Sequence, residues 1–253
     1  MTPGFRDFEF DLPGALLVHL VRVLDGMEAG PLTAAGLQSV PEAQGVYQLF
    51  LDGRLVYIGK TDAESGLLKR LVRHSFKIQH RRELDPARVT FKAVRIYVFT
   101  AMDLETQLIR HYTGEDGTAW NGSGFGSNDP GRKRDTGDPG RFDTDFPIDI
   151  DRSLDVPVTG TRTAAEVLAQ LKAELPYTLR FQAAAPRSRQ PHPELVATIV
   201  TMTDAANTPR AALAELTRQL PPGWQATALS ALLILYKEHR DDDYPAATII
   251  ARS

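Results

Sequence analysis

The sequence predicts an α+β protein with a small antiparallel three-stranded sheet flanked by helices, followed by a C-terminal α+β region. Three observations lead to this prediction. A hairpin pattern occupies residues 45–59, a run rich in β-branched and aromatic residues follows at 89–99, and amphipathic helical patterns surround both. From about residue 155 the composition shifts toward alanine and leucine, and a new succession of helices and strands begins.

The hairpin reads GVYQLFLDGRLVYIG, in which two apolar runs meet at Asp52-Gly53. This dipeptide is a strong signal for a tight turn, because glycine adopts positive φ without steric strain. Each predicted strand carries one tyrosine, Tyr47 in the first and Tyr57 in the second. The orientation of these two side chains therefore depends on how the strands are paired.

The length of the hairpin loop decides whether Tyr47 and Tyr57 share a face of the sheet. A two-residue loop at 52–53 would place Tyr47 opposite Ile58, with the tyrosines on opposite faces. A three-residue loop at 51–53, whose glycine is a left-handed bulge residue, would place Tyr47 opposite Tyr57. We predict the three-residue loop, because the chemistry inferred below requires both phenols on one face.

Apolar periodicity predicts helices around the hairpin. One helix is predicted over residues 15–27, and another within residues 62–84, whose apolar side chains recur on one side. Thr100 is a candidate N-cap for a further helix, in which apolar residues from Leu104 onward face inward. Glu105 lies near the middle of that apolar stripe, where a carboxylate is costly without a positive or hydrogen-bonding partner.

The helix within residues 62–84 has a cationic side. Residues 69–95 contain nine Lys or Arg and two Asp or Glu, in a chain whose net charge is -3. The overall charge gives no argument for a polyanionic partner, so a nucleic-acid prediction rests on this local excess. Five side chains form a narrow stripe at helical spacing: Arg70, Arg73, His74, Lys77 and Arg81.

A long glycine-rich loop, TAWNGSGFGSNDPGRKRDTGDPGRFDTDFP, follows the third helix, and loops of this length are usually functional or disordered. Beyond it the pattern reads α-β-β-α-β-β, with helices at 164–175 and 210–220 and strands near 177–182, 195–202, 226–236 and 246–252. We predict three parts: a helical lead-in at 1–40, a domain with the hairpin and the glycine-rich loop at 41–154, and an α+β domain of unknown role at 155–253.

The composition excludes several classes of protein. With 42% hydrophobic and 24% charged residues the chain is typical of a soluble globular protein. It has no cysteine, which excludes disulfides and thiolate metal sites, and no apolar run approaches the roughly 18 residues of a membrane span. Acidic residues stand near the N-terminus where a signal peptide would be basic, so we expect a cytoplasmic protein without a membrane partner.

Several of these residues occur in the order of a known motif set. Gly-Val-Tyr ends at Tyr47, Tyr57-Ile58-Gly59 follows intact, and a basic run KRLVRH, an inward glutamate and an asparagine come later, at Arg70, His74, Glu105 and Asn121. Over about residues 40–145 the chain resembles the GIY-YIG nuclease superfamily. The stretch NGSGFGSNDPGRKRD is similar to the branch that contains type II restriction endonucleases. Val46 stands where isoleucine is usual, and residues beyond about 155 have no recognised counterpart.

The resemblance implies hydrolysis of a phosphodiester bond, with catalytic roles for these positions. Tyr47 would be the general base, and Tyr57 would position Tyr47 or the attacking water. A phenol with a pKa near 10 is a poor base at neutral pH unless cations lower it, and Arg70, Lys60 and a metal ion would supply that positive field.

The remaining positions would bind the phosphate and the metal. Arg70 would hold a nonbridging oxygen through its planar fork, and His74, one helical turn later, would hydrogen-bond the phosphate or the nucleophilic water. Glu105 would hold one Mg²⁺ or Mn²⁺ ion, with waters and the substrate phosphate completing the shell. Asn121 belongs to the same catalytic set by resemblance.

Double-stranded DNA is the implied partner. The residues predicted to contact it lie on the hairpin, the basic helix and the glycine-rich loop, namely Lys60, Arg73, Lys77, Arg81, Arg132, Lys133 and Arg134. A site-specific enzyme of this kind often acts as a homodimer, so that a palindrome meets a two-fold axis. The balanced charge of residues 155–253 suits oligomerisation or protein contact better than a main DNA grip.

Two other readings of the function stay open. One is a structure-selective or phage-defence nuclease of the same superfamily, whose C-terminal domain selects branched or modified DNA or a partner protein. The other is a non-catalytic DNA-binding module in which the nuclease fold has lost activity. Each motif residue alone has an ordinary structural explanation, and the nuclease prediction depends on the ordered set.

Overall fold

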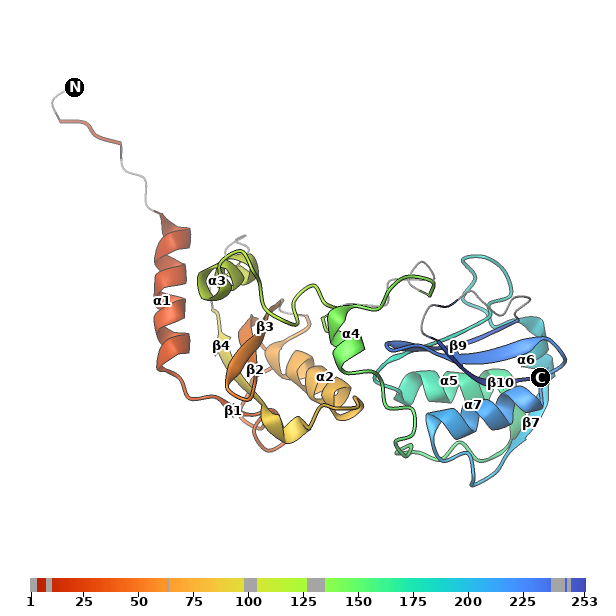
Figure 1. Cartoon of the computed structure of the whole chain (residues 1–253). Helices are drawn as coiled ribbons and strands as arrows, with labels where there is room; N and C mark the ends of the chain where they lie inside the picture. Colours follow the sequence, from red (N-terminus) through yellow and green to blue (C-terminus); the bar gives the residue numbers. More distant parts are fainter. Residues whose placement is uncertain are drawn as a thin grey trace. The chain divides into compact units, whose positions relative to one another are not determined.

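The computed structural model describes residues 4–7, 11–62, 64–97, 104–126, 135–237, 244 and 247–253. The chain divides into two compact units, each of mixed α and β structure (Figure 1). Unit 1 comprises Met1–Ser75 and Pro86–Asn121, and unit 2 comprises Phe76–Asp85 and Gly122–Ser253. The predicted ranges differ from this division, because residues 122–154 belong with the C-terminal residues.

Unit 1 is built on an antiparallel sheet in the order β1-β4-β2-β3. The three predicted strands are present as β2 (Gly45–Leu51), β3 (Arg54–Thr61) and β4 (Val89–Arg95), the last preceded by a short 3-10 helix, Pro86–Arg88. The two-residue strand β1 (Gly30–Pro31) adds a fourth member beside β4. β2 is therefore a central strand, and its side chains are buried on both faces over residues 45–49.

The hairpin between β2 and β3 has a two-residue loop, so the predicted three-residue loop is wrong. Leu51 pairs with Arg54, and both Asp52 (φ 51°) and Gly53 (φ 76°) are left-handed, as in a type I′ turn. The Arg88 guanidinium donates two hydrogen bonds to the Asp52 carboxylate, and these lower the pKa of Asp52. Hairpin twist favours this turn, and an aspartate tolerates the left-handed conformation better than most residues.

A β-bulge farther along β3 nevertheless places both tyrosines on one face of the sheet, as the sequence analysis predicts. Leu55 pairs with Phe50 and Tyr57 with Leu49, which leaves Val56 as an extra residue on β3. Tyr47 consequently pairs with Gly59, and Tyr57 lies two positions away on the same face. The shared face is thus obtained from a bulge after a two-residue turn, not from the turn itself.

Helices cover both faces of the unit 1 sheet. α1 (Leu12–Gly26) and α3 (Leu104–Thr113) pack on one face, where Leu24 and Leu108 are fully buried against Val46 and Ile58. The proposed cap of α3 at Thr100 lies outside the described residues. α2 (Leu67–Gln79) contributes His74 to the tyrosine face. This helix ends before Arg81, so the predicted basic stripe is shorter than its sequence spacing suggests.

Unit 2 contains a four-stranded sheet in the order β10-β8-β9-β6. Its strands are β6 (Thr178–Phe181), β8 (Trp224–Ala228), β9 (Leu232–Lys237) and β10 (Thr248–Arg252), with β6 parallel to β9 and the other pairs antiparallel. The single strand predicted at 226–236 is therefore a hairpin of β8 and β9. A run of apolar residues with no glycine or proline concealed this turn in the sequence.

Two helices of unit 2, α5 (Ala164–Glu174) and α7 (Pro209–Arg218), cover one face of that sheet (Figure 1). Both share a buried core with the strands, to which Leu168, Leu213 and Leu233 contribute with no exposure. The predicted strand at 195–202 is divided into the short helix α6 (Pro193–Ala197) and β7 (Ile199–Met202), and β7 pairs with an unpredicted strand, β5 (Gly160–Thr163). α4 (Arg141–Asp145) lies in the glycine-rich region.

The hairpin turn provides a stability test. We expect Gly53→Ala to lower the free energy of unfolding by about 1–2 kcal/mol, because a Cβ disfavours the left-handed conformation at φ 76°. Urea denaturation measures this loss. Gly26→Ala is the matched control, since a Cβ there meets no atom within 4 Å and φ is not positive, and it should leave stability unchanged or slightly raised. An equal loss in both variants would contradict the turn assignment.

Candidate functional site

Two tyrosines and a histidine form a buried cluster on one face of the unit 1 sheet. Tyr47 on β2 is 1% exposed, Tyr57 on β3 is 8% exposed and His74 on α2 is 4% exposed. The Tyr47 hydroxyl hydrogen-bonds the His74 Nε2 at 2.8 Å. The Tyr57 ring centroid lies 5.9 Å from that of Tyr47 and 5.5 Å from that of His74. Three of the predicted catalytic side chains are therefore in mutual contact.

Two positions beside this cluster have no space for a side chain and require glycine. A Cβ on Gly59 would lie 2.4 Å from both the Cζ and the hydroxyl of Tyr47, because the phenol ring crosses the strand at that position. A Cβ on Gly45 would lie 2.2 Å from the carbonyl oxygen of Val94. Close packing therefore requires the glycine that begins Gly-Val-Tyr and the glycine that ends Tyr-Ile-Gly. The second of these, Gly59, makes room for the Tyr47 ring.

The environment keeps both phenols protonated in the resting protein. Burial raises the pKa of Tyr47 far above its ordinary value, and Tyr57 adds to this rise while Arg70 opposes it. Burial also raises the pKa of Tyr57, with the negative charge of Glu105 as the next contribution. A buried phenolate without a compensating charge is unfavourable. Loss of the Tyr47 proton is therefore favourable only if a neighbouring group carries a compensating positive charge.

Arg70 supplies positive charge near the phenols. It lies in the first turns of α2, its side chain is half-buried, and its charge lowers the pKa of both tyrosines against the dominant effect of burial. Within the part of the chain that the structure describes, the buried Nε–H of Arg70 has no hydrogen-bond acceptor. A buried donor without an acceptor costs about 1–3 kcal/mol, so this group is suited to receive an anion.

Lys60 does not lie on the tyrosine face of the sheet, where the sequence analysis places its charge. It pairs with Val46 on β2 and alternates with Gly59, which places it on the face opposite Tyr47 and Tyr57. The positive field at the phenols comes from Arg70 in this structure.

Glu105 is the predicted metal ligand. It lies half-buried in the first turn of α3, where the helix dipole stabilises its negative charge, and its charge raises the pKa of Tyr57 and Tyr47. Across the described residues no three or more His, Cys, Asp or Glu side chains gather into a cation cage.

Asn121 hydrogen-bonds the backbone of β3 through its side-chain amide. Its Oδ1 accepts from the Ile58 N–H at 2.9 Å, and its Nδ2 donates to the Ile58 carbonyl at 2.8 Å. The neighbouring Trp120 N–H donates to the Val56 carbonyl at 2.8 Å. Residues 120–121 therefore occupy the outer edge of β3 at the bulge and on both sides of Tyr57.

Sequence reasoning missed the residue that orients this asparagine. Thr118, which is 8% exposed, donates its hydroxyl to the Asn121 Oδ1 and accepts from the Asn121 N–H at 3.2 Å. The signal was present, because a threonine three residues before an asparagine in a loop is a common local hydrogen-bonding pattern. The three-residue spacing alone gives no indication that the pair reaches β3.

Apart from Lys60, described above, the predicted DNA contacts divide into three groups. Lys77 and Arg81 are engaged inside unit 2, where Lys77 donates to the Gly124 and Phe125 carbonyls and Arg81 pairs with Asp143, so the structure gives them a different role. Arg73 is exposed on α2. The third group lies outside the described residues: Arg132, Lys133 and Arg134.

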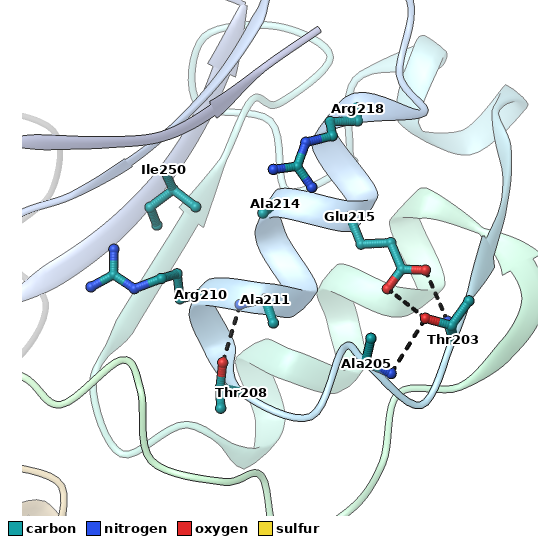
Figure 2. Close-up of a pocket in the computed structure, with 9 residues that line it drawn as sticks. All are labelled: Thr203, Ala205, Thr208, Arg210, Ala211, Ala214, Glu215, Arg218 and Ile250. Carbon is teal, nitrogen blue, oxygen red and sulfur yellow. Dashed lines mark hydrogen bonds between the residues drawn. The ribbon is translucent and has the colours of Figure 1, made fainter.

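A separate hollow of about 440 Å³ lies along α7 in unit 2 (Figure 2). Arg210 and Arg218 stand at its two ends, with Ala211 and Ala214 between them, and Glu215 bonds Thr203. None of the predicted catalytic residues lines it. We therefore assign no role in the chemistry to this hollow.

Comparison with protein-family models finds no match for this chain, and neither does comparison with curated proteins. Among the described helices, none combines the length and the apolar composition needed to cross a bilayer.

The packing of Tyr47 over Gly59 can be tested directly. We expect Gly59→Ala to lower the free energy of unfolding by about 1–3 kcal/mol, because the new methyl group forces the phenol to move. Gly30→Ala is the matched control, since its Cβ would lie 3.7 Å from the Phe91 ring, an ordinary contact. Thermal unfolding compares the two, and a Gly59→Ala protein as stable as the control would refute the packing argument.

The raised pKa of Tyr47 predicts a dependence of stability on alkaline pH. Above the ordinary tyrosine pKa of 10.0 the unfolded chain loses the phenol proton while the folded protein keeps it. Stability is then lost as pH rises, by up to about 1.4 kcal/mol per pH unit for this group. Tyr47→Phe should make the decline shallower by that amount in urea unfolding between pH 9 and 11. Parallel curves for the two proteins would contradict a buried neutral Tyr47.

Proposed function

We propose that this chain is a metal-dependent DNA endonuclease of the GIY-YIG superfamily, most similar to its type II restriction branch. The observation that carries the proposal is the contact of Tyr47 with His74 beside Tyr57, next to an arginine with an unused buried donor. These residues come from two strands and a helix, β2, β3 and α2, and the motif order alone predicts them as one set. Their contact in one cluster supports a shared chemical task.

The Tyr47–His74 pair suggests how a phenol with a raised pKa acts as a base. When Tyr47 passes its proton to the His74 Nε2 at 2.8 Å, the products are a phenolate and an imidazolium in contact. Their opposite charges offset the cost of burying either ion alone. The phenolate then takes a proton from water, whose oxygen forms a bond to phosphorus while one ester P–O bond breaks and the leaving oxygen is protonated by solvent.

Arg70 and Glu105 account for the charge that develops on the phosphate. The Arg70 guanidinium presents donors to a nonbridging oxygen, and its buried Nε–H gains the acceptor that the described residues do not provide. Glu105 would hold one Mg²⁺ or Mn²⁺ ion, which supplies charge neutralisation at the phosphoryl group and the leaving oxygen. Tyr57 keeps Tyr47 and the attacking water in line, because it contacts both Tyr47 and His74.

A Mg²⁺-dependent cleavage assay tests the proposal. Purified protein incubated with linear plasmid and phage DNA of varied sequence should give discrete fragments. Glu105→Gln and Tyr47→Phe should each reduce the rate by about 10²–10⁴-fold, as expected for loss of a charge-stabilising or basic group. Glu115→Gln, at an exposed glutamate just beyond α3, is the matched control and should cleave at the wild-type rate.

The outcomes separate the alternatives. Cleavage restricted to branched or modified DNA would indicate a structure-selective nuclease in place of a restriction enzyme. DNA binding without cleavage under any metal would favour a non-catalytic module. Cleavage that persists in Glu105→Gln would refute the assigned site.

A further inference from the structure

An arginine and a tyrosine stack on each other at the surface of unit 1, at the end of β4. The Arg95 guanidinium carbon lies 4.3 Å from the centre of the Tyr97 ring. Tyr97 is 79% exposed, more than any other large hydrophobic side chain among the described residues, and Arg95 is exposed as well. The fold therefore keeps an aromatic ring in water and holds a cation against it.

The strand pairing places this pair on the same face of the sheet as the tyrosine cluster. Tyr47 pairs with Ala93 on β4, and two residues earlier Gly45 pairs with Arg95. Cross-strand partners share a face, and so do residues two apart on one strand, so the Arg95 side chain leaves the sheet on the Tyr47 side, about 7 Å farther along.

Tyr97 continues the same face beyond β4. The residue between it and Arg95, Ile96, is buried with Leu24 and Val46 in the core on the opposite face. Because successive side chains alternate, Arg95 and Tyr97 both point away from that core. The stacked pair thus extends the tyrosine face past the end of the strand.

The helix that carries Arg70 begins at this end of the tyrosine face. The N–H of Leu67, the first residue of α2, donates to the Ala43 carbonyl at 2.8 Å, and a Cβ on Gly45 would lie 2.8 Å from the Leu67 Cδ1. Arg70 follows in the first turn of the helix. The row of the sheet that holds Gly45 and Arg95 is therefore the row against which α2 starts.

The stability of the fold does not account for this exposed pair. Most of the Tyr97 surface stays in water, so the ring gains little from the hydrophobic effect. Stacking of a cation on an aromatic ring is weak at an exposed site, and such pairs are common enough that the stack alone carries no functional inference. Its place on the tyrosine face is the observation that distinguishes it.

The two side chains keep their binding capacity. Among the residues that the structure describes, Arg95 forms no ion pair with an acid, so its guanidinium donors remain open to an anion. One face of the Tyr97 ring lies against the guanidinium, and the exposure of the residue leaves the other face open to solvent. A ligand that matches both groups is flat on one side and carries negative charge.

We infer that Arg95 and Tyr97 bind one nucleotide of the DNA beside the scissile phosphate. The Tyr97 ring stacks on a base that has left the duplex, and the Arg95 guanidinium contacts a neighbouring phosphate. A nucleobase fits the open ring face because every base presents a flat π surface, whatever its identity. This inference rests on the proposed function and adds that the protein holds an unpaired base next to the bond that is cut.

Two DNA duplexes test the binding of an unpaired base. Both have about 30 base pairs of the same sequence, and one also carries a single unpaired thymine at its centre. Full-length protein without divalent metal is titrated with each duplex, and fluorescence anisotropy measures the affinity. We expect the wild-type protein to bind the duplex with the unpaired thymine about tenfold more tightly, as expected for one additional stacked base.

Substitutions at Tyr97 separate stacking from other roles of the side chain. Tyr97→Phe keeps the ring without the hydroxyl and should keep the tenfold preference. Tyr97→Leu removes the ring and should abolish the preference, with affinity for the fully paired duplex within about twofold of wild type. Phe5→Leu, which removes another ring of unit 1 that is 68% exposed, is the matched control and should keep the preference.

The salt dependence of binding tests the phosphate contact of Arg95. Arg95→Gln removes one charge at the DNA, so the slope of log affinity against log salt concentration should become shallower by about 0.9. Arg95→Lys keeps the charge and should retain the wild-type slope.

Each outcome bears on one claim. Equal affinity of the wild-type protein for the two duplexes, or a preference that persists in Tyr97→Leu, would overturn the stacking role. An equal loss in Tyr97→Phe and Tyr97→Leu would overturn it as well, because the hydroxyl and not the ring would then be responsible. An unchanged slope in Arg95→Gln would overturn the phosphate contact. Absence of any DNA binding by the wild-type protein would instead refute the proposed function.

Discussion

The hydrogen bonds between Asn121 and Ile58 are the constraint on which the candidate site depends. Without a partner at its outer edge, β3 would be free to lose the Val56 bulge and pair regularly with β2, which would turn Tyr57 to the opposite face. Asn121 pairs with both the N–H and the carbonyl of Ile58, as a neighbouring strand would. Two such hydrogen bonds contribute about 1–3 kcal/mol in total, enough to favour one register strongly.

The same device closes an edge in unit 2. Gln219 accepts from the Thr201 N–H at 2.9 Å and donates to the Thr201 carbonyl at 3.0 Å, on the outer side of β7. A single carboxamide presents one acceptor and one donor at the spacing of a peptide, so it satisfies an exposed strand and blocks pairing with another chain. At β7 the consequence is only protection, whereas at β3 the blocked edge also determines which way a tyrosine points.

The sequence was informative where local chemistry decides the structure and failed where distant partners do. The Asp52-Gly53 turn and the α2 and α3 helices follow from local patterns, and the motif order brought Tyr47, Tyr57 and His74 to attention. The Val56 bulge was not predictable, because nothing in RLVYIG distinguishes a bulged strand from a regular one. Likewise, the helical spacing of the basic residues on α2 predicts cations that face solvent. In the fold, Lys77 instead donates to a backbone carbonyl of the glycine-rich region, and Arg81 pairs with a carboxylate there.

Buried cations in this protein differ in what satisfies them, and the difference separates structural from chemical roles. Arg81 and Arg180 each form an ion pair with a carboxylate, so their charges are neutralised within the fold and their role is structural. Arg70 keeps a buried donor without an acceptor in the described part of the chain, beside phenols whose neutrality it partly opposes. Arg81 and Arg162 also have a buried Nε–H without an acceptor among the described residues, so this donor alone does not distinguish Arg70. Arg81 differs from Arg70 because Asp143 neutralises its charge. The proposed function gives Arg70, on the tyrosine face of unit 1, the task of binding the phosphate.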